Sequence, residues 1–413
     1  MTNKNNKQNT EPYKGVRDFY PEDYFVQQHI YKAMARAAKV YGYERYDASI
    51  LEPTELYKAK TGEEIVNEQT YSFKDRGDRD VTLRPEMTPT VARMVAGRRR
   101  ELPLPIRWYS IPNLFRYERP QKGRLREHYQ LNADVFGISG VEAEIEVLSL
   151  ARKVLLELGL TDKQFKIRIN DRNIIADFFA KKFGLDTDGI YKLLKLLDKK
   201  SKIDNFDEEA EKLLGMKFSF DGLSPGENLT KIIMRLGELG AQIEFDPYII
   251  RGFDYYTGTI FEFYDSGSEN KRAICGGGRY DELLNIFGVD PLPTVGFGMG
   301  DVVARDLLET YNLLPKYKSN AIVEICPMSE DFLEEVSKLS EHLRSFGLSV
   351  LTNLSNKSLG DKVKSADKRG VPYIIVYGQD EKKTGQFKLK NLSTGDITEG
   401  DISQIVAVLK KRV

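Results

Sequence analysis

Cysteine and histidine are scarce in this 413-residue sequence. Two cysteines, Cys275 and Cys326, are too few for a disulfide framework or a Cys-rich zinc site. The three histidines, His29, His128 and His342, are scattered along the chain and do not add a cluster of metal ligands. The sequence therefore predicts reduced cysteines and no metal site built from protein ligands.

An excess of charge and a long apolar run are also missing. Lys+Arg and Asp+Glu number 62 each, so the formal net charge is zero and any nucleic acid must be held by local contacts. No stretch of about 18 apolar residues could span a membrane, and residues 1–11 lack the apolar core of a secretory signal. We therefore expect a cytoplasmic protein with no membrane association and a frayed N-terminus.

The pattern of apolar residues predicts the elements of a first domain. The length exceeds the roughly 100 to 200 residues of a usual domain, which indicates two or three domains. Apolar residues at helical spacing predict a helix that begins at Pro21 and ends before Gly42. Runs at 107–119 and 127–136, separated by the turn residues 120–123, predict an antiparallel hairpin.

The residue patterns in the middle and at the end of the chain differ from the alternating pattern of this hairpin. Lys-rich and Asp-rich helical patterns at about 170–243 predict a helical insertion, and strand character returns at 249–263 and 294–299. Strands and helices then alternate, which predicts an α/β module with a mostly parallel sheet. We expect one domain at 1–315, interrupted by the insertion, and a second at 318–413.

A basic loop joins the strands of the predicted hairpin. Alternation places Arg116 and Glu118 on one face of the first strand, and His128, Gln130 and Asp134 on one face of the second. A solvated sheet face would show the same alternation. The connecting loop, however, also holds cations beside a glycine, namely Lys122, Arg124 and Arg126. Because guanidinium groups chelate phosphate oxygens in a planar fork, this loop suits a triphosphate.

The hairpin residues Arg-Tyr-Glu-Arg-Pro-Gln-Lys-Gly-Arg, from Arg116 to Arg124, resemble motif 2 of the class II aminoacyl-tRNA synthetases in its histidyl-tRNA synthetase form. The segment Arg-Gly-Phe-Asp-Tyr-Tyr-Thr-Gly, which begins at Arg251, is similar to the histidine-specific motif of that family. Arg-Pro-Glu-Met-Thr at 84–88 resembles its Arg-Pro-Glu-Gly-Thr loop, and Gly-Gly-Gly-Arg-Tyr-Asp at 276–281 resembles the segment before motif 3. Taken alone, the first of these two segments fits a solvated turn and the second a Gly-rich structural turn.

The resemblance implies how ATP would be held. Arg116 would bind the α-phosphate of ATP and the carboxylate of histidine, and Glu118 would bind the adenine amino group. Arg124 and Arg126 belong to the loop that contacts pyrophosphate and the tRNA acceptor end, while His128 would pack on the adenine ring. Mg²⁺ would accompany ATP.

The resemblance also implies a histidine pocket with Arg251 and Arg116 as its catalytic residues. Its members would be Glu86, Thr88, Arg116, Gln130, Asp134, Arg251, Tyr255 and Tyr256. Attack of a carboxylate on the α-phosphate builds negative charge, which the fixed guanidinium of Arg251 can stabilise. Asp134, where the family usually has Glu, and Tyr256 are the candidates for pairing with the two imidazole nitrogens. For Tyr255 and Tyr256, packing in an aromatic core is the alternative.

Motif 3 departs from the family pattern. Its usual continuation, Gly-Leu-Glu-Arg, reads Gly-Asp-Val-Val from Gly300 to Val303, so the arginine that stacks on adenine is missing at its expected position. Arg305 lies two residues further along the chain. We leave the motif 3 arginine unassigned.

The resemblance, which extends over nearly the whole chain, implies an α+β class II synthetase catalytic core, an antiparallel sheet flanked by helices, with a helical insertion and a C-terminal α/β anticodon-binding domain. The implied function is that of a homodimeric histidine-tRNA ligase, which uses L-histidine, ATP and tRNA(His). A non-catalytic regulatory paralogue from histidine biosynthesis is the main alternative, but such paralogues generally lack the last domain and lose the catalytic arginines. A sensor domain attached to a kinase and a prolyl or threonyl enzyme fit less well, because no kinase segment is present and the motif at Arg251 is specific to histidine.

Overall fold

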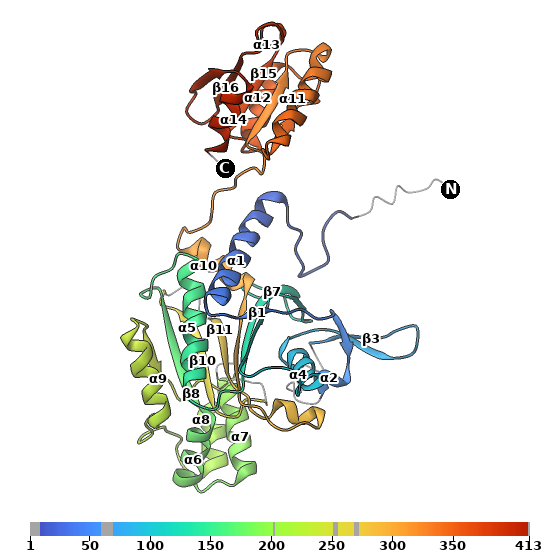
Figure 1. Ribbon diagram of the computed structural model, residues 1–413. Helices are drawn as coiled ribbons and strands as arrows, with labels where there is room; N and C mark the ends of the chain where they lie inside the picture. The colour runs from blue at the N-terminus through green and yellow to red at the C-terminus, as the bar shows by residue number, and fades with distance from the viewer. Residues whose placement is uncertain (1–8, 59–68, 201–202, 251–254, 268–271, 412–413) are drawn as a thin grey trace, which may run out of the picture. The chain divides into compact units, whose positions relative to one another are not determined.

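The computed structural model describes residues 9–58, 69–200, 203–250, 255–267 and 272–411. These residues form two compact units, and the boundary between them lies between Leu314 and Pro315 (Figure 1).

A large sheet forms the centre of the first unit. Among the described residues it has nine strands in the order β1-β5-β7-β12-β11-β10-β8-β9, with β6 paired to β7 beside this path. Neighbouring strands are antiparallel except for the edge pairs β1 with β5 and β8 with β9. The predicted antiparallel sheet is therefore confirmed. Its strands are β1 (Glu44–Arg45), β5 (Ile106–Ser110), β6 (Asn113–Phe115), β7 (Glu127–Phe136), β8 (Phe165–Asp171), β9 (Ile243–Phe245), β10 (Thr259–Asp265), β11 (Ala273–Arg279) and β12 (Thr294–Gly300).

Four helices bury the apolar face of this sheet in one large core. They are α1 (Pro21–Val40), α5 (Glu142–Glu157), α9 (Glu227–Glu238) and α10 (Asp301–Thr310), and α5 crosses in front of the sheet in Figure 1. On β7, Leu131, Ala133 and Val135 point into this core, as alternation along a strand requires. The polar residues between them face the opposite side, which confirms the predicted division of this strand into two faces.

Smaller elements cover the other face. A three-stranded sheet has the order β2-β4-β3, with β2 (Leu51–Pro53), β3 (Tyr71–Lys74) and β4 (Asp80–Leu83). The helices α2 (Glu55–Lys58), α4 (Thr88–Gly97) and the short 3-10 helix η2 (Leu283–Phe287) lie near it, and a second apolar cluster joins α4, η2 and the main sheet. The functional residues discussed below lie on this face.

Three helices between β8 and β9 build an apolar cluster of their own. They are α6 (Arg172–Phe183), α7 (Thr187–Asp198) and α8 (Phe206–Leu214). Phe179 and Phe220 stack with ring centroids 5.9 Å apart, and Phe218 meets Phe220 edge to face. The fourth helix of this stretch, α9, packs on the main core instead.

Three predicted features were wrong in detail. The run at 107–119 is divided between β5 and β6 near Pro112, which cannot donate to a ladder, and it ends at Phe115, so Arg116 and Glu118 lie beyond the strand. The strand expected from residue 249 begins only at Thr259, and residues 251–254 lie outside the described residues. The glycines at 276–278, which alone fit a turn, lie in strand β11.

The second unit contains a five-stranded sheet in the order β14-β13-β15-β16-β17. The strands β14, β13 and β15 are parallel, whereas β16 and β17 extend the sheet on one side with antiparallel pairs. The α/β class is therefore confirmed, but the sheet is mixed and not mostly parallel as predicted. The elements are β13 (Val323–Pro327), η3 (Glu330–Phe332), α11 (Leu333–Ser345), β14 (Val350–Thr352), α12 (Leu359–Lys368), β15 (Tyr373–Tyr377), α13 (Gln379–Thr384), β16 (Phe387–Asn391), β17 (Ile397–Gly400) and α14 (Ile402–Lys410). The sequence did not indicate α13 or β17.

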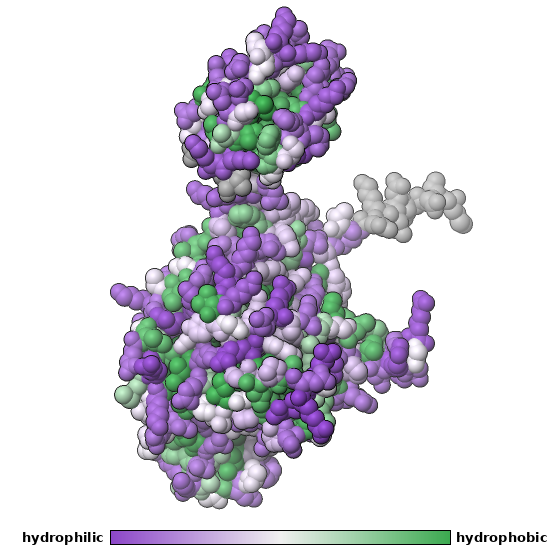
Figure 2. Space-filling view, viewed as in Figure 1, coloured by the Kyte–Doolittle hydropathy of each residue, from purple (hydrophilic) through white to green (hydrophobic). Residues whose placement is uncertain are grey.

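The surface is predominantly polar on the face drawn in Figure 2, with apolar patches scattered among the hydrophilic side chains. Among the helices of the described residues, none is both long enough and apolar enough to cross a bilayer.

Candidate active site

Two neighbouring cavities lie on the polar face of the main sheet and share part of their walls. Arg116, Gln130, Gly276 and Gly298 line both. We name the first the tyrosine cavity, which is also lined by Glu86, Thr88, Asn132, Asp134, Tyr255, Tyr256, Tyr280, Gly296 and Phe297. We name the second the arginine cavity, which is also lined by Glu118, Gly123, Arg124, Leu125, His128, Arg272, Ala273, Ile274, Cys275, Gly300, Val302 and Val303.

A buried carboxyl group marks one wall of the tyrosine cavity. The hydroxyl of Tyr280 donates a hydrogen bond to Oδ1 of Asp134, whereas Oδ2 of Asp134 is buried and has no hydrogen-bond partner among the residues that the structure describes. Burial raises the pKa of Asp134 to about 7, and the hydrogen bond from Tyr280 opposes this shift. Since a buried acceptor without a partner is costly, Oδ2 is suited to a ligand N–H.

Glycines on β12 make room for these polar side chains. Gly296 lies opposite Asp134 in the register of β12 and β7, and a Cβ at Gly296 would overlap Oδ1 of Asp134 and the hydroxyl of Tyr280. A Cβ at Gly298 would lie 2.6 Å from Nε2 of Gln130. The side chains of β7 can therefore lie over the neighbouring strand because that strand has no side chains at these positions.

Aromatic rings and a second carboxylate complete the tyrosine cavity. Tyr255 and Tyr256 are buried, with ring centroids 4.8 Å apart, and both contact the ring of Tyr280. The hydroxyl of Tyr255 donates to Oε2 of Glu86 at 3.2 Å. The two rings pack in an apolar cluster and also line the cavity, so the packing interpretation is confirmed, while their part in binding an amino acid stays a prediction.

Arg116 lies between the two cavities. Its Nε donates to the carbonyl of Pro85 at 2.9 Å, which ties the hairpin loop to the segment that carries Glu86 and Thr88. A guanidinium group in this position can contact ligands on both sides. Among the described residues, the structure thus brings Arg116 together with the predicted histidine-binding residues other than Arg251, and with most of the predicted ATP-binding residues.

The arginine cavity combines cations with one carboxylate. Arg124 forms an ion pair with Glu118 through two hydrogen bonds. Burial, together with the charges of Arg116, Arg17 and Arg124, lowers the pKa of His128 to about 3. His128 is therefore a neutral ring at physiological pH and can pack on an apolar or aromatic ligand.

The tight turn of the hairpin loop closes next to this cavity. Gln121 and Arg124 exchange backbone hydrogen bonds of 3.0 and 2.8 Å around Lys122 and Gly123. Gly123 has a φ of 74°, which glycine adopts without the steric cost that a side chain imposes.

Arg126, which was predicted to bind ATP, and Arg305, which was left unassigned, line neither cavity. Nε of Arg126 donates to the carbonyl of Glu118 at 3.1 Å, and its guanidinium lies 4.0 Å from the ring centre of Tyr117. Arg305 on α10 pairs with Asp23 at 2.8 Å and with Glu309. The contacts of Arg126 therefore stabilise the loop, and Arg305 connects α10 to α1.

Arg251, predicted to be catalytic, lies outside the described residues. Its convergence with Arg116 stays a prediction. The segment that follows is firmly held, because the backbone N–H of Thr257 donates to the carbonyl of Arg279 at 2.8 Å.

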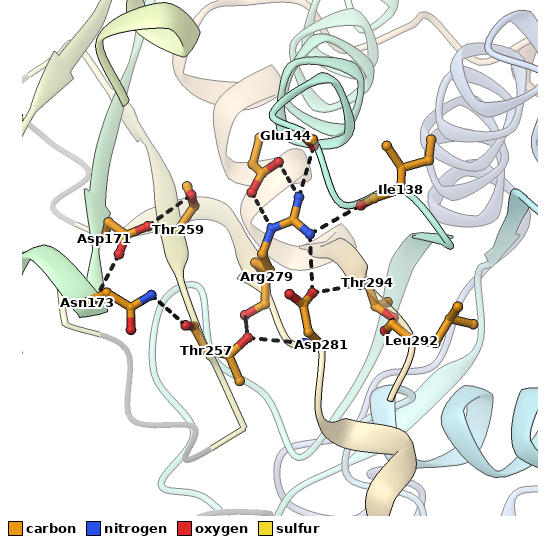
Figure 3. A network of polar contacts seen from close by, with 11 residues as sticks. Ile138, Glu144, Asp171, Asn173, Thr257, Thr259, Arg279, Asp281, Leu292 and Thr294 are labelled. Atoms are coloured by element: carbon orange, nitrogen blue, oxygen red, sulfur yellow. Dashed lines mark hydrogen bonds and ion pairs between the residues drawn. The ribbon is translucent and has the colours of Figure 1, made fainter. Parts of the chain in front are cut away.

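A polar network behind the tyrosine cavity fixes this segment (Figure 3). Arg279, at the end of β11, donates to both carboxylate oxygens of Glu144 on α5 at 2.7 and 2.6 Å, and its Nη1 donates to Asp281 at 3.2 Å. The backbone N–H of Asp281 donates to Oγ1 of Thr257, and Nδ2 of Asn173 donates to the carbonyl of Thr257. Strand β11, helix α5 and the insertion thus position the chain that carries Tyr255 and Tyr256.

Sequence reasoning placed Asn132 on the polar face of its strand but gave no role to Asn132, Tyr280 or Arg272, whose side chains line the cavities. Tyr280 stood within the quoted Gly-Gly-Gly-Arg-Tyr-Asp segment. If this segment is read as a strand, Arg279 and Tyr280 fall on opposite faces, which would have pointed to Tyr280. Within the described part of the chain, no group of three or more His, Cys, Asp or Glu side chains could hold a metal ion.

The chain is similar to known proteins along its whole length. A family model described as histidyl-tRNA synthetase matches residues 15–212 and 203–300, and one described as an anticodon binding domain matches residues 323–412. A histidine–tRNA ligase from Leptospira biflexa is 40% identical over 435 residues, which cover 99% of each chain. A histidine–tRNA ligase from Thermoplasma volcanium is 37% identical over 422 residues, covering 95% of this chain and 97% of the relative.

A solved structure has the same fold. The crystal structure of histidyl-tRNA synthetase from Nostoc sp. PCC 7120 superimposes with a TM-score of 0.81 at 23% identity, and covers 98% of this chain and 100% of that chain. Together with the similarity in sequence, this agreement shows that the chain belongs to the histidyl-tRNA synthetase family.

Proposed function

We propose that this protein is a histidine-tRNA ligase, which activates L-histidine with ATP and transfers the histidyl group to tRNA(His). One observation carries the proposal. A cavity walled by a buried carboxyl group and phenols adjoins a cavity lined by guanidinium groups, and Arg116 lines both. An amino acid and a triphosphate bound in these two cavities would meet at Arg116.

The tyrosine cavity would select the imidazole ring. Oδ2 of Asp134 accepts a hydrogen bond from one ring nitrogen, and the hydroxyl of Tyr256 donates to the other. A side chain without a matching N–H would leave the buried Oδ2 of Asp134 without a donor among the described residues, which strongly disfavours it. Glu86, Thr88 and Gln130 bind the α-ammonium end of the amino acid.

The arginine cavity would hold ATP. Arg116 binds the α-phosphate, Arg124 binds the pyrophosphate portion, and Glu118 accepts from the adenine amino group while the neutral ring of His128 packs on the base. Because Glu118 and Arg124 pair with each other in this structure, ATP must replace this ion pair with contacts of its own. Arg126 acts in the mobile loop toward the acceptor end of tRNA. Mg²⁺ enters with ATP as part of the substrate.

The reaction has two steps. A carboxylate oxygen of histidine attacks the α-phosphorus, the bond to the β-phosphate oxygen breaks, and pyrophosphate leaves. Negative charge grows on the α-phosphate during this step, and Arg116 and Arg251 stabilise it. A terminal ribose hydroxyl of tRNA then attacks the histidyl carbonyl and releases AMP.

The rest of the molecule would serve tRNA binding and assembly. The second unit, matched by the anticodon binding domain model, would bind the anticodon region. We propose a cytoplasmic homodimer whose interface includes the segment around β2, a proposal supported by the exposed apolar side chains Ile50 and Leu51. Sedimentation at several concentrations tests the dimer.

Histidine-dependent exchange of labelled pyrophosphate into ATP tests the activity, with each standard amino acid assayed in turn. We expect histidine to be the only one of these amino acids that supports exchange. Arg251→Ala should reduce the rate about 100-fold or more, because it removes a guanidinium that acts in the transition state. Folded protein that exchanges no pyrophosphate with any amino acid would instead favour the regulatory alternative.

A further inference from the structure

We infer that Arg272 is a nucleotide-binding residue that contacts ATP in the arginine cavity. This inference rests on the proposed function and deepens it. Arg272 directly precedes strand β11, and neither the motif analysis nor the proposed roles above include it. Among the described residues, three guanidinium groups line this cavity, those of Arg116, Arg124 and Arg272.

The side chain of Arg272 lies next to Gly123, at the tip of the hairpin loop. Cδ of Arg272, Oδ2 of Asp306 and Cγ2 of Val303 lie 3.5, 3.5 and 3.8 Å from the point where a Cβ on Gly123 would stand. The stem of Arg272 therefore crosses from the sheet to a place between the loop and α10. The absence of a side chain at Gly123 leaves this path open.

Helix α10, which lies wholly within the described residues, forms one wall of the arginine cavity and contributes no free cation of its own to that wall. This helix contributes Val302 and Val303 to the cavity, both apolar, while Arg305 on the same helix is paired with Asp23 and Glu309. The cation at this wall is thus supplied by the strand β11 side and not by α10. Arg116 contacts the carbonyl of Pro85 and Arg124 pairs with Glu118, so these two arginines mark other parts of the cavity.

A triphosphate carries several negative charges, and a guanidinium at each end of the cavity matches that distribution. Arg116 stands at the end shared with the tyrosine cavity, and Arg272 stands by the loop tip and α10. Arg272 therefore serves the end of the nucleotide that lies away from the reacting α-phosphate. Its loss should weaken ATP binding without changing the binding of histidine.

A purely structural role would act through Asp306. Burial raises the pKa of the Asp306 carboxyl, and the charges of Lys122, Arg17 and Arg272 oppose this shift, so Arg272 is close enough to steady Asp306 electrostatically. If this were its only task, removal of the Asp306 charge would have the same effect as removal of the Arg272 charge. Asp306→Asn is therefore the matched control.

The experiment compares Arg272→Gln, which keeps part of the side-chain stem, with Arg272→Ala and Asp306→Asn in the full-length protein. Pyrophosphate exchange gives KM for ATP and for histidine, and calorimetric titration gives the Kd of ATP. We expect both Arg272 variants to raise KM and Kd for ATP about tenfold or more, since a hydrogen bond to a charged group is lost, with KM for histidine changed less than twofold. Asp306→Asn should leave ATP binding near the wild-type value.

The inference is overturned if Arg272→Gln, with a wild-type melting temperature, binds ATP as tightly as the wild type. It is also overturned if Asp306→Asn weakens ATP binding as much as the Arg272 variants do. Titration with ATP alone does not depend on catalysis. Wild-type protein that binds ATP through Arg272 but exchanges no pyrophosphate would therefore contradict the proposed function and leave the inference standing.

Discussion

At the scale of single residues, we expect Asp134 to make the binding of histidine depend on pH. Its pKa of about 7 means that the carboxyl gains a proton as the pH falls through neutrality, and a protonated Oδ2 no longer accepts a hydrogen bond from an imidazole N–H. We expect kcat/KM for histidine to fall as the pH decreases below about 7. Pyrophosphate exchange between pH 5.5 and 8.5 measures this profile, because kcat/KM reports ionisations of the free enzyme and the free substrate.

Asp134→Asn provides the matched control. The side chain of free histidine titrates near pH 6.5 and therefore contributes to the same acid limb, which is the fall of kcat/KM at low pH. The Asn variant should have a much lower kcat/KM and should keep only the limb that belongs to the substrate. Identical profile shapes for the two proteins would contradict the assignment of this ionisation to Asp134.

Tyr280→Phe tests the residue that is hydrogen-bonded to Asp134. The hydroxyl of Tyr280 donates to Asp134 and opposes the rise in its pKa, so its loss should raise that pKa further. The acid limb of kcat/KM for histidine should therefore move to higher pH than in the wild type, while KM for ATP stays the same. A limb that stays in place or moves to lower pH would show that Tyr280 does not tune this carboxyl.

At the scale of elements, the pairing of β7 with β12 makes the tyrosine cavity possible. Gly296→Ala would place a methyl group against the carboxyl of Asp134 and the hydroxyl of Tyr280, which are both buried and hydrogen-bonded to each other. We expect a rise of at least about tenfold in KM for histidine, or a loss of about 1 to 3 kcal/mol of stability where the strands separate instead. Gly300→Ala is the control, since a Cβ there meets no atom within 4 Å. Equal behaviour of the two variants would contradict this account of β12.

The ion pair between β11 and α5 should stabilise the fold beneath the site. Glu144 is buried and Arg279 is 11% exposed at its side chain, so Glu144→Ala leaves a largely buried cation with weaker partners. We expect a loss of about 3 kcal/mol in the free energy of unfolding. Urea titration followed by the fluorescence of Trp108, the single tryptophan, reports on this unit.

Glu309→Ala is the comparison, because the pair of Glu309 with Arg305 is more exposed and should contribute less than about 1 kcal/mol. Similar midpoints for the two variants would show that the network in Figure 3 contributes little to stability.

The elements also show which sequence patterns could be read and which could not. Strand β7 was predictable because its two faces differ, with Leu131 and Ala133 in the core and Gln130 and Asp134 in the cavities. Strand β11 was not predictable in the same way, since a run of glycines has no side chains to alternate. Arg272 and Tyr280, which directly precede and follow that strand, were missed because the glycines did not indicate a strand; once the strand is known, alternation separates Tyr280 from Arg279.

The prediction that Arg116 and Glu118 lie on a strand was wrong for another reason. Arg116 and Glu118 were placed by strand alternation, but the strand ends at Phe115 and tertiary contacts with Pro85 and Arg124 decide where these side chains lie. Alternation cannot foresee such contacts, because they come from segments distant in sequence or from the loop itself. The cations of the loop suggested a site for a triphosphate, and the resemblance to motif 2 gave Arg116 and Glu118 their separate roles in it.

At the scale of the whole molecule, the two units have separate cores. Apolar clusters around the main sheet contain residues from the first unit, whereas Val323, Ile375 and Leu389 belong to a cluster confined to the second. A chain that ends at Leu314 should therefore fold and keep its cavities. We expect histidine-dependent pyrophosphate exchange within about threefold of the wild type, since that reaction requires only the first unit.

Charging of tRNA should respond differently to the same truncation. If the second unit binds the anticodon region, its removal should lower kcat/KM for tRNA about tenfold or more, which corresponds to at least about 1.4 kcal/mol of lost binding free energy. Aminoacylation with labelled histidine measures this value beside the exchange rate. Equal losses in both assays, with Trp108 fluorescence unchanged, would mean that the second unit supports adenylate formation itself, and the division of labour between the units would have to be abandoned.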